Sequence, residues 1–160
     1  MLSVRQGVFG GLLVLALGVG AVGVVTAADD PAAIIAARRD LMKDQGKQMG
    51  IINDFVQNQK GSAADVATAA KQIEADSAKI VALFPKGTSL DDFPGKTGAK
   101  PVIWEKWDDF KKAADDLGSE AKELAEVAAG GDAAKIAAQF GETGKNGCGG
   151  CHSTFRQKLN

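Results

Sequence analysis

The chain contains no tyrosine, a single histidine and only two cysteines among its 160 residues. It also has no block of basic residues, because 19 Lys and Arg are offset by 20 Asp and Glu, for a formal net charge of −1. Nucleic-acid-binding domains carry a basic patch, so we exclude that class and expect no nucleic-acid partner. A chain of this length forms one compact domain, which also excludes large multidomain enzymes.

The pattern of half-buried strands is missing too. No segment after residue 28 alternates apolar and polar side chains, whereas four segments repeat apolar residues at helical spacing. The expected helices cover residues 31 to about 58–61, 63–84, 101–129 and 133 to near the C-terminus. Gly141, Gly144 and Gly147 are candidates to break the last of these helices. The sequence therefore predicts an all-α fold, an antiparallel four-helix bundle, in which a cofactor can lie among facing helices.

Helix-start signals support these boundaries. Asp30 stands just before a proline, Asp132 follows two glycines, and Ser62 with Asp65 has the form of a capping box. Between the second and third helices, residues 85–100 hold two prolines and three glycines without periodicity. We expect one long loop there, and loops of that length are often functional.

The first 28 residues are different in character. One positive charge precedes an almost wholly apolar run over residues 7–25, which ends in small residues suited to cleavage after Ala27 or Ala28. An uncleaved anchor is the alternative, because the run approaches the roughly 18 to 20 residues of a spanning helix. Five glycines between Gly10 and Gly23 favour cleavage. We expect a signal peptide over 1–27 and a periplasmic domain over 28–160 without stable membrane insertion.

Both cysteines and the histidine lie in one pentapeptide, Cys148-Gly149-Gly150-Cys151-His152. This CxxCH pattern is the signature for covalent attachment of a c-type haem. On a helix, thiols at i and i+3 emerge on one face, where each can form a thioether with a haem vinyl group. The adjacent imidazole of His152 can then coordinate the iron as the proximal ligand.

Three other interpretations of the cysteines are weaker. A disulfide between them would close a very small loop and constrain the unfolded chain little. A structural zinc site uses four ligands, and the sequence holds three Cys and His side chains in total. A CxxC thiol oxidoreductase is the sharper alternative, but it usually needs a strand-rich setting. One covalent haem c is therefore the expected cofactor.

The sequence resembles the class II c-type cytochromes, that is, cytochrome c prime and its low-spin relatives. The resemblance covers essentially all of the expected mature domain. Its motifs are Arg38-Arg39-Asp40-Leu41-Met42, Leu83-Phe84-Pro85, Pro101-Val102-Ile103-Trp104 and the segment from Cys148 to Arg156. It implies a bundle with haem c on the C-terminal helix, and homodimerisation through the first two helices is common among such proteins.

The resemblance also implies individual roles around the haem. His152 would be the proximal ligand, Met42 would lie on the distal face with Phe84 nearby, and Arg38 would lie by the haem propionates. Arg156 matches an arginine one turn after the ligand histidine, and a solvated position is the alternative for each arginine. Phe155 stands where many relatives have tyrosine, which removes a hydroxyl group.

The sequence favours an electron carrier over two other functions. Once His152 is the proximal ligand, Met42, Met49 or a lysine remains as a side-chain sixth ligand, and the resemblance selects Met42. The alternative is a five-coordinate haem protein that binds nitric oxide or carbon monoxide, with Met42 as an apolar side chain of the distal pocket. A peroxidase comes third because no second histidine can act as acid–base catalyst, so we expect no enzyme.

Redox proteins of the periplasm are the expected partners. Lys145, Arg156 and Lys158 flank the attachment site of an otherwise mildly acidic domain. A ring of positive charge at the haem edge would steer an acidic partner. Ordinary solvated side chains are the alternative.

Overall fold

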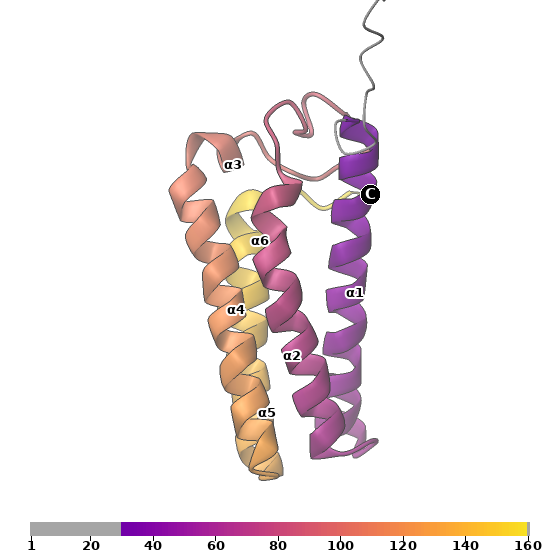
Figure 1. Cartoon of the computed structure of the whole chain (residues 1–160), viewed down its shortest axis with the longest axis vertical. Helices are drawn as coiled ribbons and strands as arrows, with labels where there is room; N and C mark the ends of the chain where they lie inside the picture. Colours follow the sequence, from indigo (N-terminus) through magenta and orange to yellow (C-terminus); the bar gives the residue numbers. More distant parts are fainter. Residues whose placement is uncertain (1–29, 160) are drawn as a thin grey trace, which may run out of the picture.

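The computed structural model describes residues 30–159 and is all-α (Figure 1). The predicted signal peptide over 1–27 lies outside the described residues. Within 30–159, the only pairing of extended backbone is an isolated antiparallel bridge between Ala99 and Arg156. None of the helices in this range is long and apolar enough to cross a membrane.

The first two helices begin where the sequence signals predict. Helix α1 (Pro31–Asn58) starts at Asp30, whose carboxylate accepts a hydrogen bond from the amide two residues later at 3.0 Å. Helix α2 (Ala63–Ile80) starts at the capping box, in which the Asp65 amide donates to Ser62 Oγ at 3.2 Å and the Ser62 amide donates to Asp65 Oδ2 at 2.8 Å. These contacts satisfy amides that have no partner within the helix.

The end of the second helix and the third helix differ from expectation. The α-helical part of the second stops at Ile80 and tightens into the 3₁₀ turn η2 (Val81–Leu83), so the prediction of a helix to residue 84 was slightly too long. A single helix over 101–129 was wrong. The structure has α3 (Val102–Glu105) and α4 (Trp107–Ala129), separated at Lys106 with φ −117° and ψ 52°.

A contact distant in sequence accompanies this break. The indole Nε1 of Trp104 donates to the carbonyl oxygen of Phe84 at 3.0 Å, which joins α3 to the end of the second helix. On the other side of the break, Trp107 packs against Phe110 with ring centroids 5.6 Å apart. The break therefore lets Trp104 bond to Phe84 while Trp107 packs against Phe110.

The last helical run is continuous but not uniform. Asp132 caps α5 (Ala133–Glu142), the π-helix η3 (Thr143–Gly149) follows, and α6 (Gly150–Phe155) completes the run. The glycines that were candidates to break this helix do not end it; the chain stays helical and changes its hydrogen-bond spacing instead. A Cβ on Gly147 would lie 2.8 Å from Leu117 Cδ1, so the absent side chain lets η3 approach α4 closely. Wider π turns of this kind are frequent at functional sites.

The elements form the predicted antiparallel four-helix bundle, with α1, α2, α4 and the α5–η3–α6 run as its helices (Figure 1). Helix α2 packs along both α1 and α4, and α4 packs along α5 and η3. Helix α1 meets α5, whereas α6 packs mainly on η3, α4 and α3. Helix α1 and the α5–η3–α6 run therefore contact each other near α5 and have little direct contact near α6.

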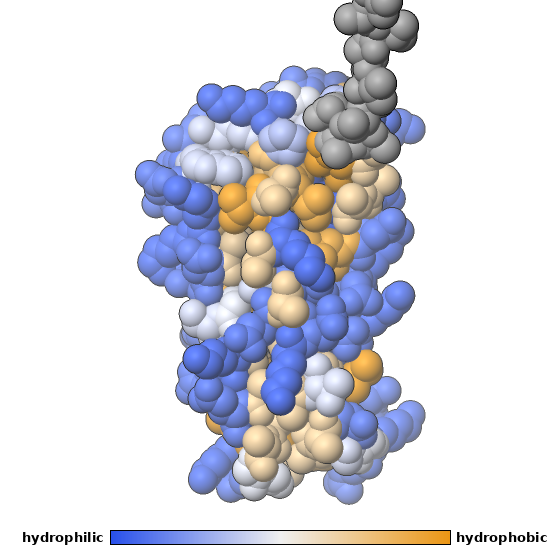
Figure 2. Space-filling view, in the orientation of Figure 1, coloured by the Kyte–Doolittle hydropathy of each residue, from blue (hydrophilic) through white to orange (hydrophobic). Residues whose placement is uncertain are grey.

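The core holds an aromatic cluster near the α3 end of the bundle. Phe110 is buried and lies 4.7 Å from Phe84 and 5.4 Å from Phe155 between ring centroids. On the surface, apolar side chains gather toward this end of the bundle, and charged side chains flank them (Figure 2). The aromatic core and the apolar part of the surface seen in Figure 2 thus lie at the same end of the bundle.

Candidate functional site

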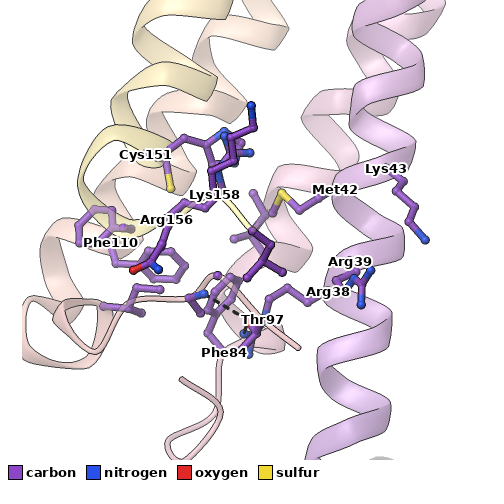
Figure 3. Close-up of a pocket in the computed structure, with 18 residues that line it drawn as sticks. Arg38, Arg39, Met42, Lys43, Phe84, Thr97, Phe110, Cys151, Arg156 and Lys158 are labelled. Carbon is purple, nitrogen blue, oxygen red and sulfur yellow. Dashed lines mark hydrogen bonds between the residues drawn. The ribbon is translucent and has the colours of Figure 1, made fainter. Parts of the chain in front are cut away.

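A cavity of about 350 Å³ lies between α1 and α6 (Figure 3). Its floor is the aromatic cluster, because Phe84, Phe110 and Phe155 all line it. One wall is α1, which contributes Met42, and the opposite wall is α6, which contributes Cys151 and His152. The space is thus mainly apolar and is flanked by the only histidine of the chain.

The two cysteines stand on either side of the change from π to α geometry. Cys148 lies in η3, and Cys151 is the second residue of α6. Both are free thiols and half-buried against the core. Cys151 and His152 line the cavity directly, whereas Cys148 lies one turn back along the helix.

Burial keeps these side chains neutral. It raises the pKa of the Cys151 thiol to about 11, with a further contribution from the neighbouring Cys148 and a partial offset from Arg156. Burial also raises the pKa of Cys148 and, together with the positive charge of Arg156, lowers the pKa of His152. A neutral imidazole is the form that coordinates a metal. Thiols with raised pKa values are poor thiolate nucleophiles, which argues against a thiol oxidoreductase.

Met42 of α1 lies across the cavity from Cys151 and His152 of α6. Its side chain extends from α1 into the cavity, with the sulfur directed toward the α6 side (Figure 3). Met49 is the other methionine of α1. Its Cε lies 3.8 Å from the position that a Cβ on Gly144 would take, and it does not line the cavity. The structure therefore brings Met42, Cys151 and His152 to one space.

Arg38, one turn before Met42, is buried with 4% of its surface exposed. Its guanidinium donates to the carbonyl oxygens of Leu83 and Thr88 at 2.9 and 3.1 Å. It also donates to the hydroxyl oxygens of Thr88 and Thr97 at 2.7 and 3.2 Å, and it lies 3.9 Å above the ring of Phe84. Burial lowers the pKa of Arg38 to about 10, so the group stays charged at neutral pH without a carboxylate among these partners.

Comparison with known proteins identifies the family and supports the fold. The family model for cytochrome c' matches residues 33–156, which include both walls of the cavity and the CxxCH segment. The chain belongs to the cytochrome c' family. Members of this family are non-enzymatic haem proteins, which confirms the expectation that this protein is not an enzyme.

Its relatives within the family carry different names. Cytochrome c' from Pararhodospirillum photometricum is 35% identical over 127 residues, which cover 79% of this chain and 98% of that protein. Cytochrome c-556 from Agrobacterium tumefaciens (strain II Chrys) is 37% identical over 129 residues, which cover 78% and 97%. The predicted resemblance to class II cytochromes is confirmed.

Solved structures agree with this membership. The crystal structure of cytochrome c' from Thermochromatium tepidum has a TM-score of 0.72 and 30% identity, covering 81% of this chain and 98% of that one. A nitric oxide complex of a cytochrome c prime variant from Alcaligenes xylosoxidans has a TM-score of 0.69 and 25% identity, with the same coverage. The all-α bundle with cysteines near the C-terminal end is therefore the fold of this cytochrome c' family.

The residues present fit a covalent haem. The cavity offers an aromatic floor and a neutral imidazole beside a thiol. Within residues 30–159, no three His, Cys, Asp or Glu side chains are grouped so that they could hold a metal ion. Family membership implies that the cofactor is haem c.

The cavity rim is basic, as expected, but its members differ from the expected set. Arg156 and Lys158 line it, whereas Lys145 is exposed on η3 away from it. The exposed Arg39 and Lys43 of α1 take part instead, and Lys43 pairs with Asp40 at 3.1 Å. Among residues 30–159, no Asp or Glu side chain lines the cavity. The rim could not be assigned from sequence because it joins two helices whose facing residues lie more than a hundred positions apart.

Proposed function

We propose that this protein is an exported single-haem cytochrome of the c' type whose distal face binds nitric oxide or carbon monoxide. Cys148 and Cys151 would hold the haem through thioethers, and His152 would be its proximal ligand. The observation that carries this proposal is the apolar cavity between α1 and α6, with the only histidine on one wall. When bound there, the haem would supply an iron able to bind a small diatomic ligand, with His152 as the side chain that would hold it.

The surrounding side chains suit the binding of a small neutral gas. Phe84, Phe110 and Phe155 present apolar surface that excludes water from the floor of the cavity. Met42 on the α1 wall is a flexible apolar side chain that can yield space to a diatomic ligand. Similarity to cytochrome c prime from Alcaligenes xylosoxidans, solved with bound nitric oxide and with bound carbon monoxide, supports the same ligand class here.

Electron transfer with Met42 as the sixth ligand is the second candidate. It is supported by the sulfur of Met42, which is directed into the cavity from the wall opposite His152 (Figure 3). A thioether is a soft, neutral ligand that raises the reduction potential of the iron, which suits a carrier. The sequence favours this candidate, whereas the solved relatives with bound gases favour the first.

The ferric absorption spectrum of the haem-loaded protein at neutral pH separates the two functions. If the distal position is open, the spectrum is high-spin and remains so in Met42→Ala, and the ferrous protein binds carbon monoxide. A low-spin spectrum that becomes high-spin in Met42→Ala but not in Met49→Ala would replace gas binding by the carrier function. Met49→Ala is the matched control because it removes the same thioether from the same helix outside the cavity.

Export and assembly complete the proposal. Removal of residues 1–27 would deliver the domain over 28–160 to the periplasm, and N-terminal sequencing of the secreted protein tests the cleavage site.

Homodimerisation through α1 and α2 stays a prediction. Such a contact could use Ile51 of α1, which is 45% exposed. It could also use the apolar side chains that gather toward the α3 end of the face shown in Figure 2. Sedimentation velocity measures the assembly state.

A further inference from the structure

Thr97 connects the buried arginine of α1 to the chain that follows the histidine. Its Oγ1 accepts hydrogen bonds from Nη1 of Arg38 and from the backbone amide of Ala99, both at 3.2 Å. Thr97 is itself buried, with 3% of its surface exposed. The hydroxyl therefore fixes both the direction of the loop and its distance from α1.

The residues after Thr97 pair with the segment after α6. The Gln157 amide donates to the Gly98 carbonyl oxygen at 2.8 Å, and the Lys100 amide donates to the Phe155 carbonyl oxygen at 3.1 Å. Between them, Ala99 forms the antiparallel bridge to Arg156. A Cβ on Gly98 would collide with the carbonyl oxygen of Gln157, so the two strands of backbone are in close contact.

This connection spans the place where the two walls of the cavity have little direct contact. Helix α1 packs on α2 and α5, and α6 packs mainly on η3, α4 and α3. Thr97, Gly98 and Ala99 line the cavity between these walls. The distance from α1 to the segment around His152 is therefore set, at this end, by the loop and its hydrogen bonds.

We propose that Arg38 is a positioning residue that acts through Thr97 and residues 98–100 to hold the chain following His152 in register with α1. The role expected from the family, a direct contact with the haem propionates, does not require Thr97. The positioning role does require it, and it requires the planar guanidinium, which reaches Leu83, Thr88 and Thr97 together. This inference does not depend on whether a gas or Met42 occupies the distal position.

Thr97→Val in the haem-loaded protein separates these roles. Valine keeps the shape of the side chain and leaves the charge of Arg38 in place, but it removes the acceptor. Both hydrogen bonds to Thr97 Oγ1 are then lost, and the amides of Gln157 and Lys100 should exchange with deuterium at least about tenfold faster, which corresponds to about 1.4 kcal/mol. Amides in the cores of α2 and α4 should keep their wild-type rates, and the reduction potential of the iron should shift because the segment after His152 is freer.

Conservative variants complete the test. Thr97→Ser keeps the hydroxyl and should return the exchange rates and the potential to wild-type values. Arg38→Lys keeps the charge but cannot reach all three acceptors, so it should resemble Thr97→Val. Thr68→Val is the matched control, because that hydroxyl bonds only within α2, to the carbonyl oxygen of Ala64 at 2.9 Å.

Unchanged exchange at Gln157 in Thr97→Val would overturn the proposal. So would equal acceleration in all core amides, which would indicate general destabilisation, or a failure of Thr97→Ser to restore the wild-type rates. If Thr97→Val gives too little folded protein, the contrast between Thr97→Ser and Arg38→Lys decides the same question.

Discussion

Replacing Gly147 by alanine tests the close packing that places the attachment cysteines. Gly147 lies in η3 directly before Cys148, and its backbone angles are ordinary for a helix. A Cβ there would lie 2.8 Å from Cδ1 of Leu117 and 3.3 Å from its Cα. Leu117 is 5% exposed in the core, so neither its side chain nor α4 can move away freely.

Two opposing effects set the magnitude. Alanine stabilises a helix interior by about 1 kcal/mol relative to glycine, through a smaller loss of backbone entropy. Overpacking a filled core costs about 1–3 kcal/mol. Because the clash at Gly147 includes the backbone of Leu117, we expect the second effect to prevail, with a net loss of up to about 2 kcal/mol in the free energy of unfolding.

Gly141→Ala is the matched control, since a Cβ at Gly141 meets nothing within 4 Å on the same helical run. That variant should be more stable than wild type by about 0.5–1 kcal/mol. Urea unfolding of the haem-loaded proteins at 25 °C, followed by far-ultraviolet circular dichroism, measures both changes at constant m-value. If Gly147→Ala is stabilised as much as Gly141→Ala, the close approach of η3 to α4 is refuted.

Three further predictions concern the cofactor, the core and the rim. Serine at both Cys148 and Cys151 should leave mostly apoprotein, and haem released from denatured wild-type protein into acidified organic solvent would contradict covalent attachment. Phe110→Ala should lower the free energy of unfolding by about 3–5 kcal/mol, because a ring with 1% exposure is lost from the aromatic cluster; a urea-unfolding loss below about 1 kcal/mol would contradict that packing. If the cations around Arg156 and Lys158 steer an acidic redox partner, the bimolecular rate should fall as salt rises, and a rate independent of ionic strength would exclude steering.

The features that could be predicted from sequence are those encoded within a few residues. The capping side chains of Asp30, Ser62 and Asp132 lie within three residues of the amides they accept from, so the helix starts were right. The CxxCH segment is local as well, and together with the three other motifs it indicated the family. Cys151, His152 and Met42 all line the cavity, and the roles toward a haem that the resemblance implies for them stay predictions.

The features that could not be predicted depend on contacts between distant residues. The break at Lys106 accompanies a bond from Trp104 to Phe84, 20 positions earlier. The π geometry of η3 lies against Leu117, a residue of another helix. The acceptors of Arg38 lie 45 to 59 positions along the chain, so sequence reasoning found the arginine but not Thr88 and Thr97.

The distribution of small side chains explains why the cavity lies between α1 and α6. The buried faces of α2 and α4 are rich in alanine, and a Cβ on Gly118 of α4 would lie 2.7 Å from Oγ of Ser77 on α2. Small residues let these two helices approach closely, because the distance between helix axes follows the side chains at the contact. The large aromatic side chains Phe84, Phe110 and Phe155 line the cavity instead, and Phe110 is itself a residue of α4. The close contact of α2 with α4 leaves no space between that pair, so the apolar space that a cofactor could fill lies between α1 and α6.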